Sequence, residues 1–576
     1  MMRINLVLIA SLLFCGVFAQ LGANSGKSWI GHGGNTDCTR YQKNGYGINS
    51  SKKVFSTGTP AFTQTNAPVS ATPNIYKGRS TFPDWKGILR QTVVTTGAIV
   101  WERDIMSYYF NNLVYPGNQT RASVVQVDDK RIVVAVGAPA FVLLVDYNNG
   151  VLLGSFNAST DPNCSFTLLT GSGVVEDERY LYQPVSTTAS FAQFPCCKCT
   201  GHLLKIDLNT MSLMWDYRTI PASVTGLGKF SGASVWMSGN PISKTLNSVF
   251  ITTGQNHNAP LDYQNCIISG NSSTWDSCNY LQPGYSENYF VSFIRIDKTL
   301  GVKQCATRAL PFDVWNIACS ALFPPGNPLC PVLDAYSSRD FDMHTGVTLE
   351  EDGHEDGRPR GYTGNKGGSL FKWFADTCEV EHVIQVSPGG SLGGVGWGLA
   401  VDKKEPQKNH PGKVYFTIIN EIFAAPITVS PLTLSNATTV PRGGWGSVNK
   451  YTFGNLEVIS NPANYDPTGF FGNNRVRTAH SHGPPCVVDD VVFIVSADSV
   501  GTFNNPAPAV WGNGGFIYQV SKYNMSNIID SVATGAGGYG GCAAADGSVC
   551  CGHGYRAPPL FGITNTGPLY HMCWHA

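Results

Sequence analysis

Cysteines are the reactive residues whose number and spacing stand out in this chain of 576 residues. There are 17, and two pairs are adjacent in sequence, Cys196-Cys197 and Cys550-Cys551. Cysteines at this density either form disulfides in an oxidising compartment or bind metals as thiolates. Cys196 and Cys199 have the spacing of half a zinc site, but no matching second pair follows, so we discount a metal there. We therefore expect disulfide chemistry.

Signatures of several common enzyme classes are absent from the sequence. There is no Gly-x-Gly-x-x-Gly opening a helix, no Walker loop, no Gly-x-Ser-x-Gly elbow and no His-Glu-x-x-His. There is also no Cys-x-x-Cys-His, the attachment signature of a c-type haem. These absences argue against nucleotide-dependent, serine-hydrolase and zinc-protease chemistry, and against a covalent haem.

Seven segments with polar, aromatic or glycine-rich patterns occur in an order that resembles one family. They are Trp29–Tyr41, Phe194–Asp207, Gly232–Pro241, Val249–Asn256, Ser338–Met343, Gly364–Gly368 and Ser387–Gly398, with an echo at Cys551–Tyr555. Together they resemble the β-propellers of quinoproteins that bind pyrroloquinoline quinone (PQQ), and most of all the polyvinyl-alcohol-dehydrogenase-like proteins. The matches cover nearly the whole mature chain, and Ser387–Gly398 is the most specific.

This resemblance implies a PQQ site near the propeller axis. Trp236 would be the flat floor on which the quinone stacks, and Trp397 would also contact the cofactor. Cys196 and Cys197 would form a vicinal disulfide that covers the other face of the quinone. The alternatives are that both tryptophans only pack between strands, and that Cys199 or a distant cysteine pairs with Cys196 or Cys197.

The resemblance assigns the chemistry to Asp342 and Lys366. Asp342 would be the general base that takes the proton of the substrate hydroxyl, and the alternative is a solvated turn residue. Lys366 would be the cation beside the quinone oxygens, and the alternative is an exposed lysine in a glycine-rich turn. The implied reaction is oxidation of a small or polymeric alcohol. A separate acceptor would take the electrons, because the chain carries no covalent haem.

The family also implies Ca²⁺ against the quinone, and here the sequence departs from the family. The ligands would be Asp342 and, at the position of an asparagine, Gln255. The family's glutamate ligand falls near Ser186–Ser190, which reads Ser-Thr-Thr-Ala-Ser without a carboxylate. Calcium takes about six to eight oxygens, usually with charged carboxylates. The missing glutamate argues against the metal, and it keeps open a second hypothesis, a cofactor-free propeller that acts as an extracellular binding or structural protein.

A repeated strand–turn–strand unit must position these residues. Period-two apolar strands flank turns rich in Asp, Gly and Thr at Val94–Trp101, Leu144–Leu153, Leu204–Trp215 and Ile294–Val302. Such hairpins bury their faces by stacking on neighbours, and tryptophans that follow the turn are typical of propellers, where they dock between blades. We predict an all-β, eight-bladed β-propeller of quinoprotein type, with roughly 70 residues per blade. No segment shows helical periodicity of useful length.

The N-terminus and the composition indicate a secreted protein. Residues 1–19 read as a signal peptide with the apolar run Leu6–Phe18, which leaves 20–576 as a single propeller domain. Without Cys15, the 17 cysteines become 16, an even number that fits full disulfide bonding. Glycosylation sequons begin at Asn49, Asn118, Asn157, Asn163, Asn271, Asn436 and Asn524. Zero net charge argues against nucleic-acid partners, and no later run is long enough to span a membrane.

Overall fold

The computed structural model describes most of residues 26–576. The description has gaps at 66, 109–121, 138–139, 161–163, 165–167, 188–198, 227, 237–238, 271–273, 311–312, 316–340, 353–355, 387–393, 403–412, 420–445, 453–454, 459–478, 481–482, 499–515, 524–526, 535–539 and 555–568.

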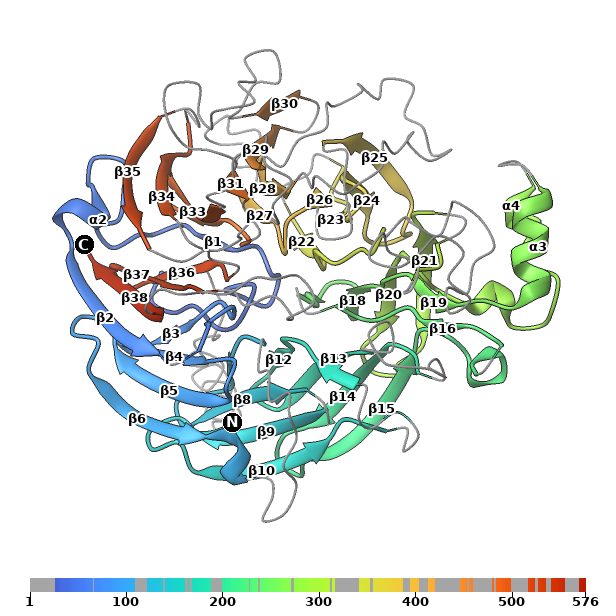
Figure 1. The fold of residues 1–576 in the computed structure, drawn as a ribbon, viewed down its shortest axis with the longest axis horizontal. Coiled ribbons are helices and arrows are strands. Elements are labelled where there is room, and N and C mark those ends of the chain that lie inside the picture. Colours follow the sequence, from blue (N-terminus) through green and yellow to red (C-terminus); the bar gives the residue numbers. More distant parts are fainter. Residues whose placement is uncertain are drawn as a thin grey trace, which may run out of the picture.

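The described strands form eight sheets of four to six strands and one two-stranded sheet. These sheets follow one another around a central axis in chain order, from blue through green to red (Figure 1). In sheets such as the one from β3 to β6, the first strand lies near the axis and the last lies at the rim. The fold is therefore an all-β propeller, as the hairpin repeats predict.

Sheets 1 to 4 come from the chain up to Arg308. Sheet 1 contains β3 (Asn74–Tyr76), β4 (Arg79–Pro83), β5 (Ile88–Val93) and β6 (Ile99–Asp104). Sheet 2 contains β7 (Val125–Gln126), β8 (Arg131–Val136), β9 (Phe141–Asp146) and β10 (Leu152–Asn157). Sheet 3 contains β11 (Leu168–Thr170), β12 (Val174–Glu176), β13 (Tyr180–Thr187), β14 (His202–Asp207) and β15 (Ser212–Arg218). Sheet 4 contains β17 (Ile242–Ser243), β18 (Ser248–Thr252), β20 (Ser292–Asp297) and β21 (Lys303–Arg308), and the two-stranded sheet contains β16 (Ser231–Gly232) and β19 (Asn256–Asn258).

Sheets 5 to 8 complete the ring. Sheet 5 contains β22 (Thr348–Glu350), β23 (Arg360–Gly364), β24 (Ser369–Phe374) and β25 (Val380–Gln385). Sheet 6 contains β26 (Gly394–Val395), β27 (Ala400–Asp402), β28 (Lys413–Ile419), β29 (Gly446–Thr452) and β30 (Asn455–Val458). Sheet 7 contains β1 (Tyr41–Gln42), β31 (Ala479–His480), β32 (Cys486–Val488), β33 (Val491–Asp498), β34 (Phe516–Ser521) and β35 (Ile528–Ala533). Sheet 8 contains β36 (Cys542–Ala545), β37 (Ser548–Gly552), β38 (Leu569–His575) and β2 (Thr59–Thr65).

The four predicted hairpins form as β5–β6, β9–β10, β14–β15 and β20–β21. Their turns show why the sequence repeats aspartate. Asp146 Oδ1 accepts the backbone N–H of Asn148 at 2.8 Å, and the N–H of Gly150 donates to the Asp146 carbonyl at 2.9 Å. Asp297 Oδ1 repeats this arrangement by accepting the N–H of Thr299 at 2.8 Å. The aspartate thus fixes the turn from inside, a local signal that a sequence can show.

Tryptophans dock between neighbouring sheets as predicted. Trp101 of β6 donates from Nε1 to the carbonyl of Tyr147 in sheet 2 at 3.0 Å. A Cβ added to Gly150 would lie 2.7 Å from the Trp101 ring, so this glycine is needed for the close approach. Trp215 of sheet 3 repeats the contact on sheet 4, where its Nε1 donates to the Lys298 carbonyl at 3.2 Å.

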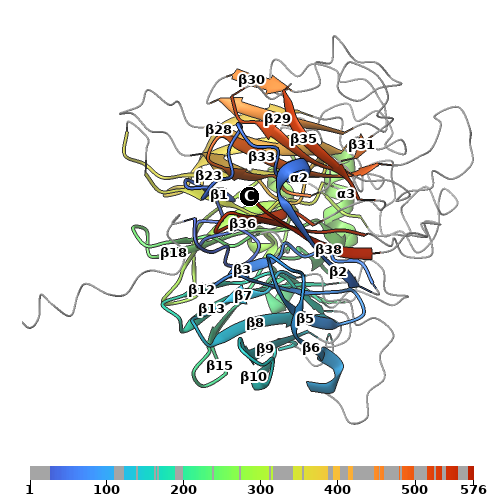
Figure 2. The same cartoon turned by 90° about the vertical axis from the view of Figure 1, so that its left-hand side faces the viewer.

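Two N-terminal segments close the ring. Strand β2 pairs with β38 from Thr59–His575 to Thr65–Leu569, so the outer strand of sheet 8 comes from the other end of the chain (Figure 2). The segment of residues 26–42, which we call the collar, makes backbone hydrogen bonds with the inner strands β3, β17, β22, β27 and β32. It therefore ties five of the eight sheets together. Its buried Arg40 donates to the carbonyls of Pro485 at 2.8 Å and Cys542 at 3.0 Å.

The described helices are few. One of them corrects the expectation that no segment of useful length is helical. Besides α2 (Val54–Thr57) and α4 (Trp275–Cys278), the nine-residue helix α3 (Leu261–Ser269) follows Pro260. Tyr263 and Ile267, one turn apart, are buried in a core cluster, and this single apolar pair is too short a pattern to show helical periodicity. Among the described residues, no helix is both long and apolar enough to cross a bilayer.

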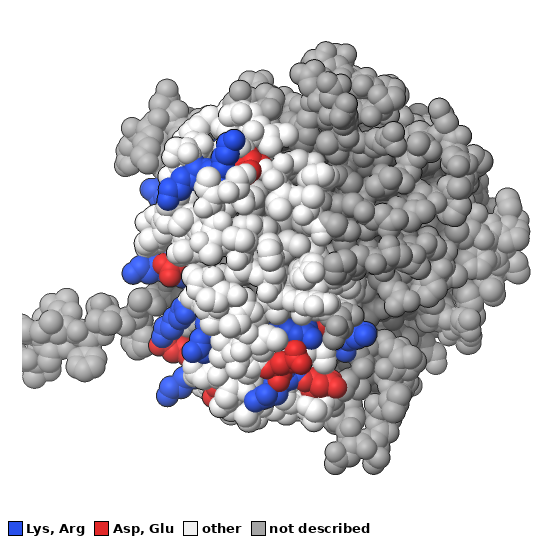
Figure 3. All heavy atoms as spheres, turned by 60° about the vertical axis from the view of Figure 1, so that its left-hand side comes forward, with Lys and Arg blue, Asp and Glu red and all other residues white. Residues whose placement is uncertain are grey.

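Charge is mixed on the part of the surface that the structure describes. Figure 3 shows lysine and arginine beside aspartate and glutamate on the described face, separated by broad uncharged areas. This face therefore presents no basic stripe of the kind that tracks a nucleic-acid backbone.

Candidate functional site

Four of the residues singled out in the sequence come from loops around the strands of sheets 4 and 5. Trp236 lies between β16 and β17, and Gln255 lies between β18 and β19. Asp342 precedes β22, and Lys366 lies in the turn between β23 and β24. Loops at strand ends can converge from neighbouring sheets while the strands stay rigid. The junction of sheets 4 and 5 therefore forms the candidate site.

Asp342 and Lys366 form a buried ion pair at this junction. Lys366 Nζ donates to Asp342 Oδ2 at 2.6 Å, and the backbone N–H of Lys366 donates to the Asp342 carbonyl at 3.0 Å. Their relative exposures are 1% for Asp342 and 7% for Lys366, so neither is the solvated loop residue of the alternative interpretation. Two contacts between the same residues hold the carboxylate and the ammonium in one geometry.

Gln255 also donates hydrogen bonds to Asp342. Its backbone N–H donates to Asp342 Oδ1 at 2.7 Å. With its amide nitrogen turned toward the carboxylate, Gln255 donates a further hydrogen bond to Oδ2 at 2.6 Å. A Cβ added to Gly254 would lie 2.7 Å from Trp236 Nε1 and would overlap Asp342 Oδ1, so only glycine fits there.

Trp236 and Trp397 lie together beside this pair. Lys366 Nζ lies 5.0 Å from the centroid of the Trp236 ring, within the range of a cation–π contact. The rings of Trp236 and Trp397 meet edge to face, with centroids 5.7 Å apart and an interplanar angle of 70°. Both tryptophans are only partly buried. The structure thus brings Asp342, Lys366, Gln255, Trp236 and Trp397 into one site.

Three histidines were missed in the sequence. The His344 ring packs edge-on against Trp397 at 5.1 Å, and His32 of the collar approaches the Trp397 carbonyl with Nε2 at 3.1 Å. Burial, together with the Lys366 charge, lowers the pKa of His257 to about 4 and that of His344 to about 3. The rings are therefore neutral at pH 7. Only His344 could have been proposed from the sequence, because it lies two positions after Asp342.

The predicted vicinal pair, Cys196 and Cys197, lies outside the described residues. The segment that follows it is close to the site, because the N–H of Gly232 donates to the Cys199 carbonyl at 2.9 Å, four residues before Trp236. Cys199 is bonded to Cys164. Cys199 is therefore not a partner for either member of the pair, and one alternative is removed.

The described disulfides correct the expectation that all cysteines of residues 20–576 are bonded. They are Cys164–Cys199, Cys266–Cys278, Cys305–Cys378, Cys542–Cys551 and Cys550–Cys573. Cys38 and Cys486 are free buried thiols, so the even cysteine count does not mean full bonding. Burial raises the pKa of each to about 12, which keeps both protonated and unreactive.

The residues around Asp342 do not fit a calcium ion. Ammonium and amide N–H groups contact its oxygens, and none of these donors can coordinate a cation. Among the described residues, no three ligand groups from His, Cys, Asp or Glu gather around Asp342. The metal roles of Asp342 and Gln255 remain predictions that these contacts do not favour.

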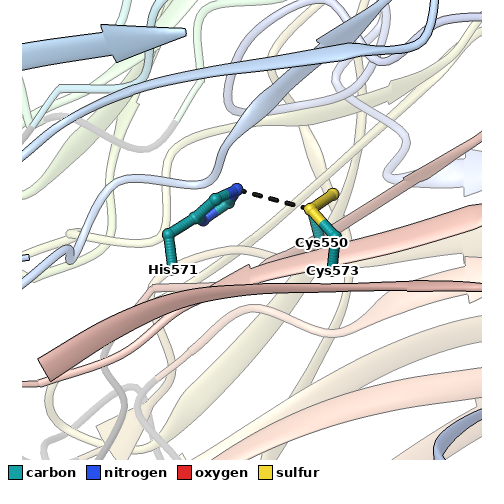
Figure 4. A group of neighbouring side chains, drawn as sticks. All are labelled: Cys550, His571 and Cys573. Atoms are coloured by element: carbon teal, nitrogen blue, oxygen red, sulfur yellow. Dashed lines mark hydrogen bonds between the residues drawn. A yellow bond between two sulfur atoms is a disulfide. The ribbon is translucent and has the colours of Figure 1, made fainter. Parts of the chain in front are cut away.

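One group of possible metal ligands does occur in the described part of the chain, in sheet 8. Cys550, His571 and Cys573 place their ligand atoms within 4.8 Å of one another. Figure 4 shows that the two sulfur atoms are bonded to each other. His571 Nε2 instead contacts Cys573 Sγ at 3.5 Å and Ser80 Oγ at 2.9 Å. The cluster is a disulfide packed on a histidine, and it is not a metal centre.

The site does fit a flat, anionic ring system. The Trp236 ring offers a partly exposed face, and its buried Nε1 has no hydrogen-bond partner among the described atoms. Lys366 supplies a cation beside that face. A partly exposed indole and a positive charge together suit a planar quinone that carries carboxylates.

Solved structures with the same fold include several dehydrogenases. A europium-containing methanol dehydrogenase matches with a TM-score of 0.58 and 12% identity, over 95% of this chain and 98% of that one. The quinohemoprotein alcohol dehydrogenase of Comamonas testosteroni matches with a TM-score of 0.59 and 12% identity, over 96% and 81%. A quinohemoprotein alcohol dehydrogenase of Pseudomonas putida HK5 gives 0.57 and 13%, over 96% and 80%.

Comparison of the sequence alone gives no such match. No protein-family model matches the chain, and no curated protein matches it. The structural likeness, at 12–13% identity, establishes the fold: the chain has the same β-propeller fold as these dehydrogenases.

Proposed function

We propose that this protein is a quinone-dependent alcohol dehydrogenase whose reaction centre is the Asp342–Lys366 pair beside Trp236. The observation that carries the proposal is that the buried carboxylate of Asp342 contacts a buried ammonium, that of Lys366, which lies 5.0 Å from the centroid of the partly exposed Trp236 ring. A buried ion pair alone is weak evidence of function, because such pairs also occur in cores. Its position beside a partly exposed aromatic floor distinguishes it from a structural pair.

Each residue has a role in this proposal. Trp236 binds the quinone by stacking, and Lys366 places positive charge next to it. PQQ, when bound, supplies the two-electron acceptor for the alcohol. Asp342 accepts the hydroxyl proton at a carboxylate oxygen, provided that the alcohol lies within hydrogen-bond reach. Trp397, packed against Trp236, holds the floor in place and bounds the site.

The other parts of the proposal follow the sequence resemblance. The alcohol is small or polymeric, as in polyvinyl-alcohol-dehydrogenase-like proteins, and a separate acceptor takes the electrons. Cys196 and Cys197 form a vicinal disulfide over the quinone. Eight blades are supported by the eight sheets with four or more strands. A signal peptide at residues 1–19, removal of which gives a secreted, glycosylated propeller of residues 20–576, is supported by the disulfides.

A second candidate is a propeller that binds no cofactor and acts as an extracellular binding or structural protein. It is favoured by the missing glutamate at Ser186–Ser190 and by the ion pair at Asp342, which satisfies the carboxylate without a ligand.

Quinone binding separates the two candidates. Purified protein is titrated with PQQ while tryptophan fluorescence is recorded, and an artificial dye then reports reduction when alcohol is added. We expect micromolar binding that is weakened at least tenfold in Trp236→Phe. The matched control is Trp85→Phe, a buried tryptophan of the loop between β4 and β5, which should leave binding unchanged. Absence of PQQ binding would leave the cofactor-free propeller.

A further inference from the structure

The carboxylate of Asp342 is neutralised by the protein itself. Lys366 Nζ contacts Oδ2 at 2.6 Å, and the Gln255 N–H contacts Oδ1 at 2.7 Å. Both side chains of the ion pair are more than nine-tenths buried. A metal ion bound at this carboxylate would share its oxygens with these donors and would lie next to a buried ammonium, whose charge repels it.

The described residues on the sheet 3 side of Asp342 contact one another through hydroxyl and backbone groups. The N–H of Thr187, at the end of β13, donates to Ser234 Oγ at 3.1 Å, and the Ser234 carbonyl accepts the N–H of Gly254 at 2.8 Å. This path from sheet 3 to Asp342 consists of hydroxyl and backbone groups. The residues that follow, Thr188, Ala189 and Ser190, add no carboxylate in sequence. The described residues of this path therefore supply none of the negative charge that helps to hold a divalent or trivalent cation.

We propose that the central site binds its quinone without a metal ion, and that the Lys366 ammonium supplies the positive charge instead. This inference rests on the proposed function for the identity of the ligand, but the closure of Asp342 to cations stands on the contacts alone. A single fixed ammonium delivers less charge than a divalent ion. It also needs no ion from the medium, so chelators leave the site intact.

The rival interpretation is that Lys366 moves away when a metal arrives. The proposal and this rival interpretation are distinguished by measuring whether the full chain binds a cation. The protein is first treated with EDTA and exchanged into fresh buffer. Tb³⁺ is added, and its emission is recorded under tryptophan excitation, because a Tb³⁺ at Asp342 would lie close to Trp236. Wild type and Trp236→Phe are compared, so that ions at the surface give equal signals in both. We expect no Trp236-dependent emission. A saturable emission that disappears in Trp236→Phe would overturn the proposal.

PQQ binding is then measured in EDTA and in Ca²⁺. Affinities within twofold of each other in wild type support the proposal, and affinity that appears only with Ca²⁺ overturns it while the proposed function stands. If PQQ binds in neither buffer, the proposed function fails, and the Tb³⁺ result alone decides whether Asp342 is closed to cations. We also expect Lys366→Met to lose at least tenfold in PQQ affinity in EDTA, whereas Lys366→Arg, which keeps the charge, retains most of it. Equal affinity in wild type and Lys366→Met would refute the role of the ammonium.

Discussion

The carboxylate of Asp342 and the ammonium of Lys366 are 2.6 Å apart; Asp342 lies in the segment that leads into β22, and Lys366 lies in the β23–β24 turn of sheet 5. Trp236 and Gln255 approach them from the region of sheet 4, so the site lies across a sheet junction. Its geometry depends on how the two sheets pack as well as on the residues themselves.

The ion pair should show strong energetic coupling. Lys366→Met leaves a buried carboxylate without its cation and should cost about 3–5 kcal/mol in the free energy of unfolding. The double variant Asp342→Asn/Lys366→Met removes both charges and should be less destabilised than the sum of the single variants. Urea unfolding of the four proteins measures this coupling. A coupling near zero would show that the two groups do not interact in solution.

Gly254 should be essential for activity although it carries no side chain. A Cβ at this position overlaps Asp342 Oδ1, so Gly254→Ala should displace the carboxylate and lower dye reduction roughly 100-fold. The control is Gly154→Ala in β10, where the added Cβ meets the flexible side chain of Met211. Folding of both variants is checked by circular dichroism. Full activity of Gly254→Ala would remove Asp342 from the proposed chemistry.

Two disulfides should differ in their contribution to stability. Cys305–Cys378 closes a loop with a sequence separation of 73 and links sheets 4 and 5. Its removal by a double alanine substitution should cost about 4 kcal/mol in global unfolding free energy. Cys266–Cys278, with a separation of 12, ties α3 to α4, and its loss should loosen that helical pair with a smaller global effect. Hydrogen exchange and chemical denaturation of the two variants test this contrast.

Stability should fall in mild acid because of His571. Burial lowers the pKa of this histidine from 6.5 to about 3 in the folded protein. Between these values the unfolded chain binds a proton that the folded chain does not, so stability decreases as pH falls. From pH 7 to pH 5 the loss attributable to one such histidine is about 2 kcal/mol. His571→Gln should remove this part of the pH dependence, whereas Ser80→Ala, which removes only its hydrogen-bond partner, should retain it. Equal pH dependence in wild type and His571→Gln would contradict the prediction.

The vicinal disulfide remains a prediction that peptide mapping can test. Because Cys199 is bonded to Cys164, cleavage after Lys198 is needed to free the peptide that contains Cys196 and Cys197 from that bond. We expect a non-reduced peptide two mass units lighter than its reduced form and linked to nothing else. A cross-link from either cysteine to a distant peptide would refute the lid over the quinone.

Local chemistry explains which features the sequence could reveal. The hairpins were predictable because Asp146 and Asp297 fix their turns within a few residues, and Trp101 shows its docking role by its place after the turn. Asp342 and Lys366 could be proposed only through family resemblance. Nothing in the spacing of His257 or His32 indicates that they approach the same site, since that proximity arises when distant loops converge. Trp29–Tyr41 was singled out by family resemblance, but the contacts of the collar with five sheets were not predicted for the same reason.

The pairing of β2 with β38 has a consequence for biosynthesis. Thr59–Thr65 leaves the ribosome before any of its partner strand, Leu569–His575, exists. While the intervening chain is translated, the backbone groups of β2 lack the partner strand β38. An unpaired strand edge of this kind promotes association with other extended chains. The growing polypeptide therefore exposes this strand until β38 has been synthesised, and closure of the ring is a late and slow step of folding.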